Sequence, residues 1–75
     1  MELIQNNDEQ NALAAAMQLL DSGELTEIQR RRFMQHFFQG LSYRQIAEHE
    51  NVHFTSVQES IAAANAKLKK YFEKL

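Results

Sequence analysis

The chain has 75 residues, a formal net charge of −2 at pH 7, no cysteine and no proline. A chain of this length forms one domain, and the absence of cysteine excludes disulfides and thiolate metal sites. No apolar stretch reaches the length of a membrane span and the acidic N-terminus is unlike a secretory signal, so we expect a cytoplasmic protein that has no membrane partner.

The charges are unevenly distributed along the chain. Residues 1–25 contain five acids and no base, whereas residues 26–75 contain five acids and eight bases, a balance of +3. The second part is therefore the candidate for contact with a polyanion, although a solvated helix surface explains the same charges.

The first expected helix follows a frayed segment at residues 1–6. Asn7 is suited to cap it, with Gln10 as the reciprocal partner three residues later, and Ser22-Gly23 ends it. The residues at helical spacing that form its predicted apolar stripe are Leu13, Ala16, Met17 and Leu20.

The second expected helix is capped by Thr26 and ends before Gly40. Its predicted apolar positions are Ile28, Phe33, Met34, Phe37 and Phe38. The run Arg30-Arg31-Arg32 covers most of one turn, so at least one of these arginines lies beside the core, its stem packed and its head expected in water.

A short third helix is expected from Ser42, its cap, with Gln45 in the capping-box position. It ends near Glu48-His49, and its inward residues are Tyr43, Ile46 and Ala47. A fourth helix begins after Val52 and runs to Phe72, with the apolar stripe Val57, Ile61, Ala64 and Leu68. The predicted fold class is therefore all-α, with four helices.

The segment from Tyr43 to Ala64 matches the requirements of a helix-turn-helix. Ala47 supplies the small residue that lets the second helix cross closely, and Asn51, four residues later, suits the left-handed conformation of the turn. The apolar residues that would join the two helices are Ile46, Val52, Val57 and Ile61. An ordinary three-helix bundle also fits this pattern.

Residues 25–75 resemble region 4 of bacterial sigma factors, the helix-turn-helix domain that recognises promoters. The resemblance rests on Leu25 with Gln29, on the turn from Phe38 to Tyr43 (FQGLSY), on Ile46-Ala47-Glu48, on Ser56-Val57, and on the tail from Ala64 to Leu68. The response-regulator domain of the LuxR type shares this scaffold, and the lysine-rich tail favours the sigma factor. Residues 1–24 are expected to form a tail and an accessory helix that packs on this domain.

The resemblance implies that the fourth helix recognises double-stranded promoter DNA and that the domain docks on the flap of RNA polymerase. Carried over by position, the residues that would face bases are His53, Phe54, Thr55, Gln58 and Glu59. Those that would contact phosphates are Ser42, Tyr43, Arg44 and Ser56, with Lys67 and Lys69 from the lysine-rich tail. A solvated helix end explains these lysines equally well, because cations stabilise a helix C-terminus.

Several positions depart from the sigma pattern. Arg32 and Glu50 stand where apolar residues are typical, and Asn51 replaces a common glycine. The outer face of the fourth helix has Phe54, Gln58, Ser60, Ala62 and Ala63 where the family carries basic residues. We therefore expect weak DNA binding unless a partner adds contacts.

The remaining motifs allow two interpretations each. The aromatic residues at helical spacing are expected in the core rather than on a stacking surface, and they are Phe33, Phe37, Phe38, Tyr71 and Phe72. Phe54 is either exposed or packed onto the preceding helix. The smooth side formed by Ala62, Ala63 and Ala66 favours the alternative function, a module that binds a partner helix or forms a homodimer.

Enzymatic chemistry and metal binding are not expected. The spacing of His36, His49 and His53 matches no zinc pattern, and the carboxylates do not form a pair suited to acid–base catalysis. No glycine-rich phosphate loop and no nucleophile with a base is recognisable. We therefore expect no catalytic residue, no metal, no cofactor and no small-molecule substrate.

Overall fold

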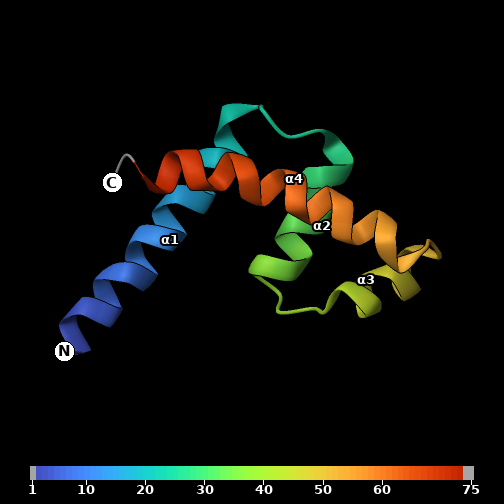
Figure 1. The fold of residues 1–75 in the computed structure, drawn as a ribbon, viewed down its shortest axis with the longest axis horizontal. Coiled ribbons are helices and arrows are strands. Elements are labelled where there is room, and N and C mark those ends of the chain that lie inside the picture. Colours follow the sequence, from blue (N-terminus) through green and yellow to red (C-terminus); the bar gives the residue numbers. More distant parts are fainter. Residues whose placement is uncertain (1, 74–75) are drawn as a thin grey trace.

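A computed structural model describes residues 2–73 of the chain, with the side chains of residues 10–73. The helices are α1 (Glu2–Ser22), α2 (Glu27–Phe37), α3 (Tyr43–Glu50) and α4 (Phe54–Phe72), and these residues contain no strand. The predicted all-α fold with four helices is thus confirmed (Figure 1).

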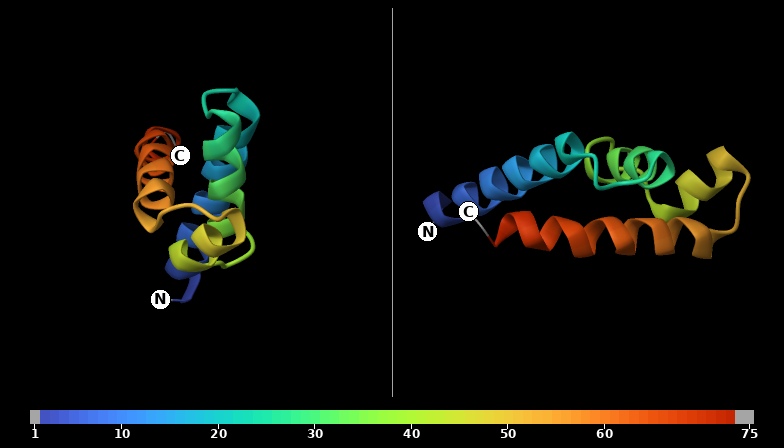
Figure 2. Two further views of the ribbon diagram at one scale, coloured as in Figure 1. Left: turned by 90° about the vertical axis from the view of Figure 1, so that its right-hand side faces the viewer. Right: turned by 90° about the horizontal axis from the view of Figure 1, so that it is seen from above.

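Helix α4 is the element against which the others pack. It runs along the length of the molecule, with α1 beside its C-terminal half and α3 beside its start (Figure 2). The helix-turn-helix therefore occupies one end of the molecule, and the last turns of α4 lie with α1 at the other end.

Capping boxes begin α2 and α3; the Thr26 cap and the Ser42–Gln45 box were predicted, whereas the reciprocal bond from Gln29 was not. The Thr26 hydroxyl accepts from the Gln29 N–H at 3.1 Å, and the Gln29 side chain accepts from the Thr26 N–H at 3.1 Å. Ser42 and Gln45 repeat this exchange at 3.1 and 2.8 Å. Each box satisfies two backbone donors that a helix start otherwise leaves unpaired, which fixes where both helices begin.

The predictions for α1 were wrong in two respects. The helix begins at Glu2 rather than after Asn7, because residues 2–6 include good helix formers and no glycine or proline interrupts them. Its buried face is Ala15, Ala16 and Leu19, whereas Leu13 and Met17 are 44% and 54% exposed. The short alanine side chains allow α4 to approach closely.

Two clusters of buried side chains form the core. The first joins α1, α2 and α4 through Ala16, Leu19, Phe33 and Ala64. The second joins α3 and α4 through Ile46, Ala47, Val57 and Ile61. Burial of each large apolar side chain contributes about 1.5–3 kcal/mol, so these few residues supply much of the stability of so short a chain.

The aromatic residues are only partly in this core. Phe33 is buried, and Phe37 and Tyr71 pack against the first cluster, as predicted. Phe38 and Phe72 are 44% and 39% exposed, contrary to the prediction. Phe38 is the C-cap of α2 and Phe72 is the last residue of α4, so both side chains lie at helix ends. Ile28, in the first turn of α2, is also exposed rather than apolar core.

Candidate nucleic-acid interface

The turn between α3 and α4 has the geometry that the sequence predicts. Asn51 adopts a left-handed conformation, with φ 54° and ψ 48°. Its N–H donates to the Glu48 carbonyl at 3.3 Å, and the Val52 N–H donates to the Ala47 carbonyl at 3.0 Å. Ala47 is 6% exposed and leaves room for α4 to cross α3. α3 itself continues to Glu50, slightly beyond the predicted end.

The predicted apolar contacts between the two helices are mostly present. Ile46, Val57 and Ile61 are fully buried, whereas Val52 is 37% exposed. Val52 lies in the turn, where its side chain has fewer neighbours than residues within the helices.

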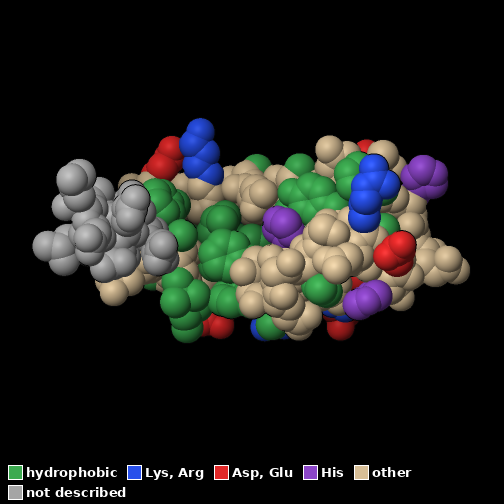
Figure 3. Space-filling view, turned by 90° about the horizontal axis from the view of Figure 1, so that it is seen from below, with side chains coloured by type: hydrophobic (Ala, Val, Ile, Leu, Met, Phe, Trp, Pro, Cys, Tyr) green, Lys and Arg blue, Asp and Glu red, His purple; other side chains and the backbone are tan. Residues whose placement is uncertain are grey.

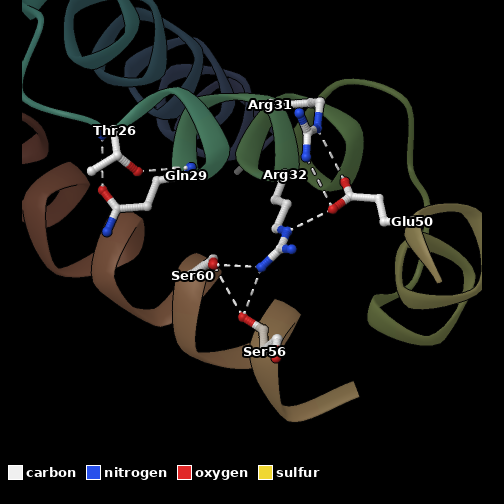
Figure 4. Close-up of polar contacts among 7 residues, drawn as sticks. All are labelled: Thr26, Gln29, Arg31, Arg32, Glu50, Ser56 and Ser60. Carbon is white, nitrogen blue, oxygen red and sulfur yellow. Dashed lines mark hydrogen bonds and ion pairs between the residues drawn. The ribbon is translucent and has the colours of Figure 1, made fainter. Parts of the chain in front are cut away.

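A polar network of buried and half-buried side chains joins α2 to the helix-turn-helix formed by α3 and α4 (Figure 4). The Arg32 Nε donates to the Glu50 carboxylate at 2.9 Å, and another guanidinium nitrogen donates to the Ser56 carbonyl at 3.1 Å and to the Ser60 hydroxyl at 2.9 Å. Arg31 adds two longer hydrogen bonds to Glu50, at 3.2 and 3.3 Å. Arg32 therefore links α2 to the last residue of α3 and to the first turns of α4.

This network explains two departures from the sigma pattern. Arg32 is 7% exposed, so its head is bound to Glu50 and not in water, as was expected of an arginine beside the core. Two residues of opposite charge at positions that are normally apolar were the sequence signal for this pair. The sequence alone does not pair these two residues, because it does not determine how α2 and α3 are oriented relative to each other.

The environment of Glu50 has opposing effects on its titration. Burial raises the pKa of its carboxyl group, but hydrogen bonds from Arg31 and Arg32 and their positive charges outweigh burial and hold that pKa below its usual value. Glu50 is therefore a carboxylate at neutral pH.

The residues predicted to face bases lie at the start of α4. His53 is the N-cap position, and Thr55, Gln58 and Glu59 are exposed on the first turns. Phe54 is half-buried: its ring centroid is 6.2 Å from that of Tyr43, and the Arg44 guanidinium carbon lies 5.1 Å above it. Of the two interpretations of Phe54, packing onto the preceding helix is the one observed.

The residues predicted to contact phosphates have differing surroundings. The Ser42 side chain caps α3, the Tyr43 ring lies tilted against His36 with their centroids 4.7 Å apart, and Ser56 is half-buried. The Lys67 ammonium donates to the Glu24 carbonyl at 2.7 Å, and Tyr71 also bonds to Glu24, so Lys67 is engaged within the fold. Arg44 and Lys69 are exposed.

The electrostatics of this face are weak. Arg44 is the one arginine or lysine on α3, and α4 has none before Lys67, while Glu48 and Glu59 are exposed acids. Figure 3, which views the molecule from below Figure 1, has hydrophobic side chains along the middle of this face and few basic ones. Favourable contact with a polyanion therefore depends on few charges.

Other kinds of site were sought in the same residues. In the described part of the chain, no group of three His, Asp or Glu side chains is arranged to hold a metal ion. No helix formed by residues 2–73 is long and apolar enough to cross a membrane.

Comparison with known proteins supplies a family. Neither the curated proteins nor the solved structures gave a significant match to the chain. A family model described as "Putative helix-turn-helix protein, YlxM / p13 like" matches residues 4–75, which includes α3, the turn and α4. The chain therefore belongs to this YlxM / p13-like family of helix-turn-helix proteins.

Proposed function

We propose that the protein is a DNA-binding transcription module that acts like region 4 of a sigma factor and recognises a promoter element with α4. The observation that carries the proposal is the turn at Asn51, which leaves Thr55, Gln58 and Glu59 exposed at the start of α4. In a helix-turn-helix, this part of the second helix enters the major groove.

The exposed side chains suit particular bases. The Gln58 amide matches the donor and acceptor pattern of an adenine edge, and the Glu59 carboxylate accepts from the N4 amino group of cytosine. A carboxylate facing DNA repels phosphates unless it reads a base, so Glu59 is the most informative position. Arg44 is the candidate for a phosphate contact beside these readers.

The small number of basic side chains favours action together with a partner. Each phosphate contact contributes about −0.9 to the slope of log K against log salt, so few contacts give a weak electrostatic contribution. Docking on the flap of RNA polymerase would add the missing binding free energy and place α4 at a promoter. This partner is part of the proposal because the sequence resembles sigma region 4.

Selection from random duplexes tests recognition of DNA. Duplexes retained by the wild-type protein at low salt are expected to share a short motif that contains a cytosine. With Glu59→Ala, the preference at that cytosine should relax, while Glu73→Ala, an exposed acid at the far end of α4, should leave the motif unchanged. Absence of any enriched motif for the wild-type protein contradicts sequence recognition.

An alternative function is binding of a protein helix, including a second copy of this chain. It is favoured by the exposed small residues Ala62 and Ala66, which allow close approach of another backbone. Replacing both by arginine separates the two functions. Loss of a partner or of a homodimer supports the alternative, whereas tighter DNA binding by the doubly substituted protein supports the first proposal.

A further inference from the structure

Two neighbouring hollows lie at the start of α4, the first bounded by α2, α3 and α4 and the second by α3, the turn and α4. The first has a volume of about 270 Å³ and is lined by His36, Ser42, Tyr43, Arg44 and Phe54. The second has a volume of about 320 Å³ and is lined by Arg44, Ala47, Glu48, Asn51, Val52 and Phe54. Arg44 and Phe54 line both hollows, with the Arg44 guanidinium over the Phe54 ring, and we call this shared wall the ridge.

The walls of the first hollow are held in place before any ligand binds. The His36 and Tyr43 rings lie 4.7 Å apart and the Tyr43 and Phe54 rings 6.2 Å apart. The Nδ1 of His36 is 2.7 Å from the Leu41 carbonyl, which fixes the ring. A preformed apolar wall binds without the entropic cost of ordering its own side chains.

The size of the hollows indicates what they can accept. Pockets for small molecules commonly enclose about 300–1,000 Å³, so the first hollow lies just below that range and the second at its lower limit. A single leucine or aromatic side chain is a better match than a cofactor. Two such side chains, separated by the ridge, would fill both hollows.

The positive charge of Arg44 on the ridge indicates which group of a ligand would lie between its two apolar side chains. Arg44 is exposed and has no hydrogen bond or ion pair within residues 10–73. A guanidinium stacked on a ring keeps the N–H donors at its edge available to a carboxylate. Glu48 lines only the second hollow, so a carboxylate of the ligand is favoured near Arg44 and disfavoured at the far end.

We propose that this surface docks an acidic amphipathic helix of a protein partner. Two apolar side chains one turn apart occupy the hollows, and a carboxylate between them pairs with Arg44. Because Arg44 is also the candidate phosphate contact, such a partner competes with DNA. This competition rests on the proposed function, whereas binding of the helix does not.

A pair of synthetic peptides tests the docking. The acidic probe is acetyl-Ala-Ala-Leu-Asp-Glu-Asp-Leu-Ala-Ala-amide, and its match has three lysines in place of the three acids. Amide chemical shifts of the labelled protein, recorded without DNA, report both affinity and location. The wild-type protein should bind the acidic peptide about tenfold more tightly than the lysine peptide, with shifts at the residues that line the hollows.

Charge reversal sharpens the test. Arg44→Glu should reverse the preference between the peptides, whereas Arg30→Glu, an exposed arginine on α2, should leave it unchanged. Phe54→Ala should weaken binding of both peptides because it removes the ring that lines both hollows. A cooperative melting curve must show that this variant is still folded. Equal affinity for both peptides, or the same effect from Arg30→Glu, overturns the proposal.

Duplex DNA separates this proposal from the proposed function. If DNA and the acidic peptide each shift the Arg44 amide and displace one another, both proposals are supported. If the peptide binds and DNA does not, only the proposed function fails. If DNA shifts the residues of the hollows and neither peptide does, the surface belongs to the DNA interface alone and the docking proposal is overturned.

Discussion

At the scale of single residues, Arg32 and Glu50 determine how α2 is joined to the helix-turn-helix. Their side chains are 9% and 12% exposed, and Arg32 also donates to α4. A buried pair of this kind recovers the cost of its desolvation only when both partners are present and hydrogen-bonded. Without Glu50, the buried Arg32 would lose its carboxylate; without Arg32, Glu50 would keep only the longer contacts of the exposed Arg31.

We therefore expect Glu50→Leu or Arg32→Ala to lower the free energy of unfolding by about 3–5 kcal/mol. Arg31→Ala, which removes a side chain that is 51% exposed, should cost clearly less than either of these changes, because solvent screens an exposed pair. The double variant Arg32→Met with Glu50→Leu should recover most of the loss. Urea unfolding followed by circular dichroism measures these differences, and equal losses for Arg31→Ala and Arg32→Ala would contradict this role.

The lowered pKa of Glu50 predicts a dependence of stability on pH. Because this pKa is lower in the folded than in the unfolded protein, the group stabilises the fold above its unfolded pKa of about 4.3. That contribution is lost as the pH falls through the folded pKa. Between pH 7 and pH 2, the free energy of unfolding should therefore fall more steeply for the wild-type protein than for Glu50→Gln. Parallel decreases for the two proteins would argue against the Arg32–Glu50 pair.

At the scale of elements, the starts of α2 and α3 followed from local chemistry, but the start and the buried face of α1 did not. The caps Thr26 and Ser42 and the left-handed Asn51 act on neighbouring backbone groups, so their residue types sufficed to predict them. The buried face of α1 depends on how closely α4 approaches, which a periodic pattern of apolar residues does not encode.

The Arg32–Glu50 pair is another feature that local sequence does not predict. It joins residues that are 18 positions apart, and it forms only because α2 packs against both α3 and α4. Of the predicted site, the turn and the exposed start of α4 followed from the sequence. The engagement of Lys67 by Glu24 did not, because that contact spans 43 positions.

The corrected face of α1 gives a prediction for this element. Leu19→Ala removes a fully buried side chain from the first core cluster and should cost about 2–5 kcal/mol. Leu13→Ala, the same change at a residue that is 44% exposed, should change stability by about 0.5 kcal/mol or less. Thermal unfolding distinguishes the two variants. A larger loss of stability for Leu13→Ala would indicate that Leu13 lies on the buried face of α1.

At the scale of the whole molecule, the basic groups are far apart. The molecule is 40 Å in its longest dimension, and α4 runs along it from the turn to the lysine-rich end. Lys69 follows Phe54 by 15 residues, which at 1.5 Å per residue is roughly 22 Å. The major groove is about 12 Å wide, so Lys69 lies beyond the groove that the start of α4 would enter.

This separation predicts the salt dependence of DNA binding. A complex in which only Arg44 meets a phosphate has a slope of log K against log salt of about −0.9, whereas added contacts from Lys69 and Lys70 bring it to about −2.7. We expect the smaller slope, with little change in Lys69→Ala. Fluorescence anisotropy over a series of salt concentrations measures it, and a steep slope that Lys69→Ala reduces would place the end of α4 on DNA.

The most direct test of recognition by α4 is an amide chemical-shift titration of the labelled protein with duplex DNA, at low and then at higher salt. We predict salt-sensitive shifts that cluster at residues 42–44 and 53–59, on the start of α3 and the start of α4. No shifts at low salt, or shifts confined to other parts of the molecule, would contradict DNA binding by this helix-turn-helix.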